Sequence, residues 1–341
     1  MDKYFKIDHS TGNLRTGKLS TGDLTLATPL LVHSGKTVQY LRPDEIWSTN
    51  TKALFYDPLI LAEDIGTGNL NKLPNLRQLL GWRGTLFTTS GASEVAKLAK
   101  SRGYKSDGVN FRLPGEGQLI HLSPEEAVQL QEQLDANIGE RLYRDVDYYA
   151  PVDDLAAGVE LTGRWNSTLS KNNFLLPVTG GGLKGFHKQS VDSLAGQQSL
   201  GYIITQTQQI DSPAEIKRNL SVVTSMLPSQ KLRVTKTRAS FEHLVAALSS
   251  GIDIIYSDVA VHEAVMGNAL VASGKRLNFD HAHFANDQEP LDSECRCPIC
   301  TGHYSRAYLH YLAKTNSPQY IGLILQHNLF WLNHFVADFR S

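Results

Sequence analysis

The feature that most constrains the fold is an alternation of strand and helix patterns that begins after residue 170. The apolar run at 175–178 ends in a glycine-rich turn, and residues 186–194 have a helical pattern. A second apolar run, at 200–204, is followed by a helix that begins at Ser212-Pro213-Ala214-Glu215. We expect Ser212 to cap this helix, because serine, proline and glutamate at these spacings form a typical helix start.

The same alternation continues downstream. Residues 232–234 and 252–256 have strand patterns, and the helical pattern between them, at 240–250, ends at Gly251. Upstream, Ser123-Pro124-Glu125-Glu126 predicts another capped helix. Successive strand–helix units with short connections predict a parallel sheet covered by helices, which is either a (β/α)8 barrel or a doubly wound sheet.

The first 32 residues have a different pattern. Short alternating runs separated by Thr-Gly turns predict a small antiparallel element ahead of the barrel. The segment GGGLKG follows a strand but lacks the spacing of a dinucleotide-binding fingerprint, and the P-loop pattern does not occur. The chain has no low-complexity linker that would divide it.

Composition narrows the class of protein further. The 33 Lys and Arg residues balance 34 Asp and Glu, so charge gives no support for a general nucleic-acid binder, although a local basic face remains compatible with RNA. The N-terminus has acidic residues and lacks the apolar core of a signal peptide, and no window has the ~18 apolar residues of a membrane helix. We therefore expect a cytoplasmic protein.

All three cysteines of the chain lie within one hexapeptide, at Cys295, Cys297 and Cys300. Three clustered cysteines cannot form a disulfide framework, and their spacing predicts a metal site that requires a fourth ligand. The spacing does not choose among the downstream histidines, which are His303, His310, His327 and His334. A closed site with three cysteines and one histidine has a structural rather than a catalytic role, because no coordination position is left for water or substrate.

The segment PLDSECRCPICTGHYSRAYLHYL, followed by LILQHNLFW, resembles the zinc subdomain of the tRNA-guanine transglycosylases, also called queuine tRNA-ribosyltransferases. That family carries C-x-C-x2-C and a histidine in a later His-Asn pair. The resemblance selects His327 as the fourth ligand. It therefore implies one structural Zn²⁺ per chain, held by Cys295, Cys297, Cys300 and His327.

The likeness covers nearly the whole chain. Gly251–Leu270 is similar to the family's G-I-D-M-F-D stretch and the G-x-A-L that follows, Gly180–Leu194 to its Q-G-S helix, and His121–Glu125 to its L-S-P-E helix. The resemblance implies a (β/α)8 barrel with an N-terminal antiparallel element over residues 1–282. It also implies an inserted zinc-binding subdomain with terminal helices over residues 283–341.

The positions that carry the family's chemistry are altered. The family exchanges a guanine in the tRNA anticodon for a deazaguanine, with one aspartate as the nucleophile on the ribose and another for proton transfer. Tyr256 and Thr89 match these two aspartates. The base-contacting positions fall at Tyr143, Thr179 and Thr205-Gln206. These losses beside an intact cysteine motif predict a barrel that has kept its scaffold and lost its catalytic residues.

We therefore predict a catalytically impaired member that acts as a tRNA-binding or accessory subunit in queuosine-type tRNA modification. The resemblance implies a homodimer, or a heterodimer with a catalytic transglycosylase. Exposed basic residues around the cysteine motif are candidates for phosphate contacts. They are Arg296, Arg306, Lys275 and Arg276.

Two other functions remain open. An active base-exchange enzyme could use a relocated nucleophile such as Asp258, which lies two residues after Tyr256 and on the same face of the strand. Asp145 and Asp147 lie near the lost base-contacting acid, and tyrosine itself serves as a nucleophile in some glycosidases. The second alternative is a regulator that binds a purine-like ligand.

Overall fold

The computed structural model describes residues 4–67, 69–113, 119–167, 171–302 and 304–340. Its centre is an eight-stranded parallel sheet in the order β10-β11-β12-β13-β14-β4-β5-β6. A parallel bridge between Phe87 and Ile138 joins the two outer strands, so the sheet closes into a barrel and the doubly wound alternative is excluded. The barrel strands are β4 (Leu30–Ser34), β5 (Ala53–Tyr56), β6 (Thr85–Thr88), β10 (Gly139–Glu140), β11 (Phe174–Val178), β12 (Gly201–Ile204), β13 (Leu232–Lys236) and β14 (Ile254–Ser257).

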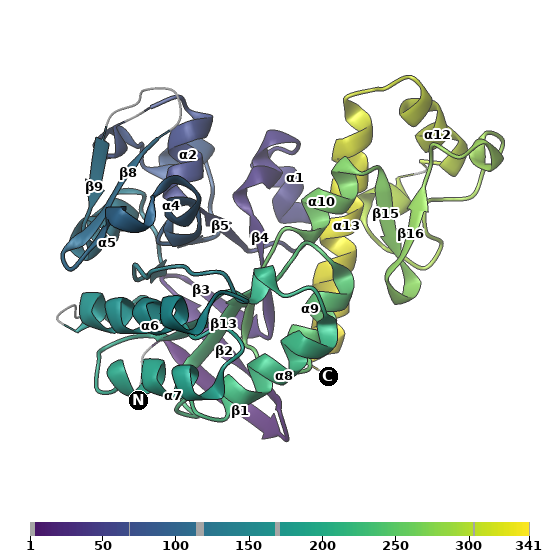
Figure 1. Ribbon diagram of the computed structural model, residues 1–341. Helices are drawn as coiled ribbons and strands as arrows, with labels where there is room; N and C mark the ends of the chain where they lie inside the picture. The colour runs from purple at the N-terminus through teal and green to yellow at the C-terminus, as the bar shows by residue number, and fades with distance from the viewer. Residues whose placement is uncertain (1–3, 68, 114–118, 168–170, 303, 341) are drawn as a thin grey trace.

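Helices follow each barrel strand and surround the barrel (Figure 1). They are α1 (Pro43–Ser48), α2 (Pro58–Asp64), α3 (Leu76–Leu80), α4 (Ala92–Leu98), α5 (Pro124–Gln133), α6 (Val152–Asn166), α7 (Lys184–Ser193), α8 (Pro213–Thr224), α9 (Phe241–Leu248) and α10 (Val259–Val265). This alternation confirms the (β/α)8 prediction. Among the described residues, no helix combines the length and apolar character that a membrane crossing requires.

The two predicted helix starts differ in detail. Ser123 caps α5 as expected, since its hydroxyl accepts from the backbone N–H of Glu126 and the Glu126 carboxylate accepts from the backbone N–H of Ser123. Ser212 precedes α8 but makes no side-chain capping bond. Glu215 instead pairs with Arg218 and accepts a hydrogen bond from Tyr148, so a longer-range contact replaces the predicted local one.

The barrel interior is filled by side chains that alternate along the strands. On β14, Ile254 and Tyr256 point into the barrel, whereas Ile255 packs outward against the helices. Phe55 and Phe87 join Tyr256 inside. The interior is therefore a packed core whose last aromatic layer lies below the C-terminal mouth.

A three-stranded antiparallel sheet covers the opposite, N-terminal end of the barrel, as the Thr-Gly turns predict. It consists of β1 (Phe5–Thr11), β2 (Leu14–Thr21) and β3 (Leu24–Thr28). Each strand contributes one residue to the interior core: Phe5, Leu19 and Leu26 respectively. Arg15 fastens this sheet to the barrel. Its guanidinium bonds both carboxylate oxygens of Asp253 at 2.7 and 2.8 Å, and both side chains are buried.

Two smaller elements extend from the barrel on opposite sides (Figure 1). The sheet of β7 (Tyr104–Lys105), β8 (Gly108–Arg112) and β9 (Leu119–Leu122) is inserted between β6 and β10. The hairpin of β15 (Asn268–Val271) and β16 (Lys275–Asn278) precedes α11 (Pro298–Thr301), α12 (Arg306–Lys314) and α13 (Gln319–Asp338). The long helix α13 packs against both α10 and β15, so it joins the barrel to the cysteine-bearing segment. The boundary at 282/283 stays a prediction.

The Arg15–Asp253 pair gives a test of how the barrel end is closed. Asp253→Asn leaves the Arg15 charge buried without a counter-ion, so we expect the free energy of unfolding to fall by about 3–5 kcal/mol. The control is Asp8→Asn, since the Asp8–Lys18 pair is long, at 3.7 Å, and more exposed; it should cost no more than about 1 kcal/mol. Urea unfolding curves measure both, and equal losses would contradict this role for Arg15.

Candidate functional site

The three cysteines and one histidine converge on one point. The thiols of Cys295, Cys297 and Cys300 and a ring nitrogen of His327 all lie within 4.8 Å of one another, so this group could hold a metal ion. Nδ1 of His327 lies 3.5 Å from the sulfur of Cys297 and 3.4 Å from that of Cys300. Hydrogen bonds from the neighbouring thiols lower the pKa of Cys297, which favours a thiolate there.

These distances fit a tetrahedral ion. With metal–sulfur bonds of ~2.3 Å and metal–nitrogen bonds of ~2.0 Å, a tetrahedron separates a sulfur from a nitrogen by about 3.5 Å. The other ring nitrogen of His327, Nε2, lies 2.7 Å from the carbonyl oxygen of Leu270 and can donate to it. That bond leaves the Nδ1 lone pair free for a metal. Histidines that bind a metal commonly donate their other ring N–H to a carbonyl or carboxylate in this way.

Asn328, which follows His327, binds the backbone of β15 with its side chain. Its side-chain oxygen accepts from the backbone N–H of Leu270 at 2.8 Å, and its amide donates to the carbonyl of Asn268 at 2.9 Å. Together with His327, it ties α13 to the edge of β15. The hairpin that braces the cysteine cluster is thus fixed by side chains of the ligand-bearing helix.

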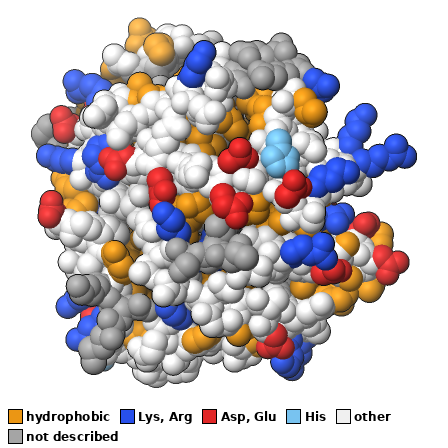
Figure 2. All heavy atoms as spheres, turned by 90° about the vertical axis from the view of Figure 1, so that its left-hand side faces the viewer, with side chains coloured by type: hydrophobic (Ala, Val, Ile, Leu, Met, Phe, Trp, Pro, Cys, Tyr) orange, Lys and Arg blue, Asp and Glu red, His pale blue; other side chains and the backbone are white. Residues whose placement is uncertain are grey.

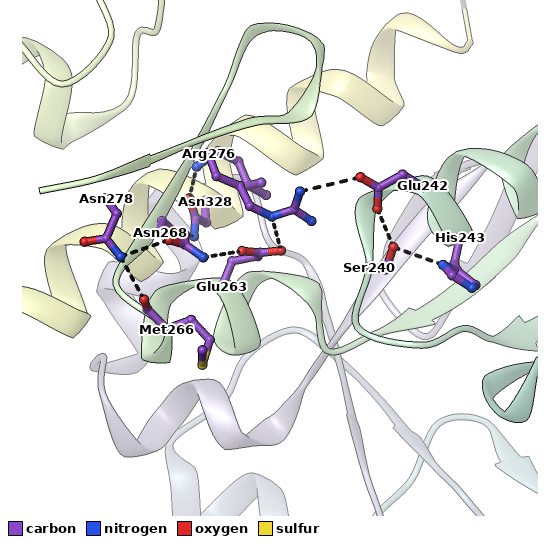
Figure 3. A network of polar contacts seen from close by, with 10 residues as sticks. Ser240, Glu242, His243, Glu263, Met266, Asn268, Arg276, Asn278 and Asn328 are labelled. Atoms are coloured by element: carbon purple, nitrogen blue, oxygen red, sulfur yellow. Dashed lines mark hydrogen bonds and ion pairs between the residues drawn. The ribbon is translucent and has the colours of Figure 1, made fainter. Parts of the chain in front are cut away.

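A second network holds the hairpin against the barrel (Figure 3). Arg276 on β16 bonds the buried carboxylate of Glu263 on α10 at 2.8 Å and approaches Glu242 on α9 at 3.5 Å. Glu263 also accepts from the amide of Asn268 at 2.9 Å. A buried carboxylate with two donors is well satisfied, so this contact fixes the hairpin on α10.

The other histidines lie elsewhere. His310, on α12, makes a 2.6 Å hydrogen bond with the carbonyl of Phe279, and His334, on α13, is exposed. His303 lies outside the described residues. Of the histidines in the described part of the chain, His327 is the one that joins the cysteines.

Tyr256, which we match to the family's nucleophilic aspartate, is part of the core. Its ring stacks on Phe55 with centroids 5.1 Å apart and planes 12° apart, and it meets Phe87 edge-on at 5.8 Å. The side chain is fully buried, and burial raises the pKa of the phenol well above its usual value. A phenol that stays protonated at neutral pH is a poor nucleophile, which argues against a tyrosine mechanism.

Thr89, which we match to the family's second aspartate, donates a hydrogen bond to the carboxylate of a residue that follows the neighbouring strand. Its hydroxyl lies 2.5 Å from Oδ2 of Asp57, which directly follows β5. Oδ1 of Asp57 caps α2 by accepting from the backbone N–H of Leu59 at 2.9 Å. Burial raises the pKa of Asp57. An acidic group thus lies beside Thr89, although it belongs to another strand.

The glycine turn after β11 is filled by a side chain. Oε1 of Gln206 accepts from the backbone N–H groups of Gly180 and Gly181 at 3.2 and 2.9 Å, and its amide donates to the carbonyl of Val146. Gln206 has φ +67°, a conformation that favours glycine. Its side chain therefore takes up the donors that the turn would offer to a ligand.

The other residues that the sequence predicts to contact a base form hydrogen bonds within the protein. The hydroxyl of Thr205 donates to the carbonyl of Val178 at 3.0 Å, and the backbone N–H of Thr179 bonds Ser190. Tyr143 is buried beside Ser93. Of the nearby acids, Asp145 is buried and Asp147 is exposed; burial raises the pKa of Asp145 to about 6.

Asp258 lies at the C-terminal mouth, at the start of α10. Its carboxylate is 3.7 Å from the ammonium of Lys236, and both line a cavity of 410 Å³. Asp258 follows Ser257, the last residue of β14, and its backbone (φ −96°, ψ 1°) is not extended, so its position does not follow from the alternation of the strand.

The four predicted phosphate contacts differ in availability. Arg276 is engaged by Glu263 and Glu242, and Arg306 pairs with Asp287 at 3.2 Å, whereas Lys275 and Arg296 are exposed. On the face that carries β9 and α5, basic and acidic side chains are interspersed (Figure 2). The described side chains of that face thus form no patch of a single sign that would attract RNA.

Sequence reasoning missed Glu140, the most unusual ionisable group of the barrel mouth. It ends β10, is 3% exposed, and accepts from the backbone N–H of Ser90 at 3.0 Å. Burial raises its pKa to about 8. Its position at the C-terminal end of a barrel strand was the available signal, because such positions in barrels face the site.

The protein is a (β/α)8 barrel, and its interior is packed with side chains up to the mouth. One long helix, α13, joins this barrel to a segment with three cysteines and one histidine that could hold a metal ion. Residues 9–341 match the family model described as "Queuine tRNA-ribosyltransferase". The chain belongs to this family.

Curated relatives agree with this assignment. The chain is 29% identical to the queuine tRNA-ribosyltransferase of Cyanothece sp. over 336 residues, which are 96% of this chain and 88% of the relative. It is 28% identical to that of Gloeobacter violaceus, over 98% of this chain and 92% of the relative. For Pediococcus pentosaceus the identity is 27%, over 99% and 91%.

Glu140 makes a prediction about pH. Its pKa is raised to about 8 in the folded protein, so between the usual glutamate value and pH ~8 the folded state binds the proton more tightly than the unfolded state. Wild-type stability should therefore fall as pH rises through this window. Glu140→Gln removes that loss and should be more stable at pH ~8 by a few kcal/mol, on the order of the linkage energy.

The measurement is the melting temperature against pH for wild type, Glu140→Gln and Glu160→Gln, whose side chain lies on the outer surface of α6. Curves for wild type and Glu140→Gln that stay parallel across the window would contradict a buried, protonated Glu140.

Proposed function

We propose that this chain is a tRNA-binding or accessory member of its family that performs no base exchange on its own. The observation that supports the proposal is the packing of Tyr256, the residue that we match to the family's nucleophile, because its phenol is buried and its pKa is raised. A sugar carbon with oxocarbenium character needs a carboxylate to capture it, and the Phe55 ring covers this phenol instead.

Two further contacts support the proposal. Gln206 uses the N–H donors of the Gly180-Gly181 turn, so a base would have to displace an internal hydrogen-bond partner. Thr89 is a neutral group at the proton-transfer position. Such a chain would act in queuosine-type tRNA modification by contacting tRNA or by pairing with an identical or a catalytic chain.

We also propose that the ion held by the cysteine cluster is Zn²⁺, one per chain, with a structural role. Three thiolates and one imidazole are a donor set that zinc prefers, and four protein ligands leave no position for a substrate. The ligands come from the loop before α11, from α11 and from α13, so the ion would staple these segments together. Lys275 and Arg296, exposed on this subdomain, would contact phosphates.

The zinc assignment predicts one equivalent of Zn²⁺ in the purified protein. Cys297→Ala should lose the ion and lower the melting temperature, because the fully buried Cys297 is a ligand that no neighbouring group replaces. His310→Ala is the matched control and should retain it, since His310 is bonded to Phe279 instead. Elemental analysis measures both; a folded wild type without metal, or full zinc retention in Cys297→Ala, would refute the ligand set.

The accessory role is tested with labelled guanine and tRNA. We expect no incorporation by this chain alone, binding of tRNA, and co-elution with a catalytic transglycosylase when the two are mixed. Incorporation by this chain alone would contradict the proposal, and so would the absence of both tRNA binding and co-elution.

A relocated nucleophile is the second candidate, favoured by the position of Asp258 at the mouth beside Lys236. If it is correct, the chain alone exchanges guanine, and Asp258→Ala lowers the rate by about 100-fold or more. Asp153→Ala, on the exposed first turn of α6, should leave the rate unchanged.

A further inference from the structure

The floor of the barrel mouth contains polar groups that the contacts described above do not satisfy. The hydroxyl of the fully buried Tyr256 has no hydrogen-bond partner among the described residues. It lines a cavity of 30 Å³ together with Glu140, Asp57 and Lys236. Glu140 receives one hydrogen bond from the protein, at Oε2, so Oε1 has lone pairs to spare. A buried, unpartnered hydroxyl beside a carboxyl group indicates a place for a polar ligand group.

Two larger cavities share lining residues with the small cavity, among them Glu94 and Lys236. They measure 410 and 400 Å³, and both are lined by Glu94, Lys97 and Lys236. Across the three cavities there are more acidic than basic side chains. The acidic residues are Asp57, Asp64, Glu94, Glu140, Asp145, Asp147 and Asp258, and the basic ones are Lys36, Lys97 and Lys236.

We propose that this mouth binds a small organic cation with a primary amino group, whose ammonium occupies the floor between Glu140 and Asp57. An ammonium has three donors and no acceptor, which matches the two carboxyl groups and the Tyr256 oxygen. The acidic lining attracts a cation and repels a phosphate or carboxylate. The proposal is independent of the tRNA-binding role, since it concerns a different ligand at the centre of the barrel.

The geometry distinguishes this ligand from two others. The first is a metal ion. In the described part of the chain, the cysteine cluster is the only group of side chains that could hold a metal ion, and the acidic residues of the mouth form no such group. The floor, at 30 Å³, accommodates a group the size of one water molecule but not an aromatic ring. The aliphatic part of an amine would extend into either of the larger cavities.

The test is calorimetric titration of RNA-free protein with spermidine and with putrescine. At pH ~9, where Glu140 is ionised, we expect saturable binding that Glu140→Gln weakens by about tenfold or more, because the substitution removes the carboxylate that pairs with the ammonium. Tyr256→Phe, which keeps the aromatic stack and removes only the hydroxyl, should weaken binding several-fold. Glu160→Gln, on the outer face of α6, is the control and should bind as wild type does.

Three outcomes would overturn the proposal. They are no saturable binding of either amine, unchanged affinity in both Glu140→Gln and Tyr256→Phe, and displacement of the amine by Mg²⁺ alone at equal concentration. Loss of binding through unfolding is controlled by the melting temperature, because Glu140→Gln is expected to be more stable than wild type above neutral pH.

Discussion

The stacking of Tyr256 on Phe55 inside the closed barrel is the contact on which the rest of the account depends. A catalytic carboxylate at this position would have to stay ionised and reach a sugar, whereas an aromatic ring fills the last layer of the core. The ring contributes burial and dispersion to the barrel, but its hydroxyl is left without a partner. Tyr256, which we match to the family's nucleophile, is thus part of the core packing.

The cysteine-bearing segment is retained for a different physical reason. His327 and Asn328 bond the backbone of β15, and Arg276 bonds the buried Glu263 on α10. Loss of the metal ligands would therefore disturb the hairpin, the last helix and their contact with the barrel together. Structural dependence of this kind preserves a motif whether or not the barrel performs a reaction.

Much of this arrangement could be predicted from the sequence. Strand–helix alternation and glycine punctuation located the later barrel units, and Ser123 with Glu126 marked a helix start correctly because that signal is local. Ser212 also precedes a helix as predicted, but its hydroxyl makes no capping bond, and the Glu215 carboxylate contacts Arg218 and Tyr148. Glu140 and Asp57 were missed, and the hydrogen bonds of Gln206 to the glycine turn were not predicted. These contacts arise from neighbours 25 to 83 positions away, which no local pattern records.

We propose that the barrel mouth does not bind the base that the family exchanges. Equilibrium dialysis of labelled guanine against the protein, with and without tRNA, tests it most directly. We expect no saturable binding in either condition, because the Tyr256 ring is packed on Phe55 and Gln206 accepts from the N–H groups of the glycine turn. Saturable guanine binding in either condition would contradict this expectation.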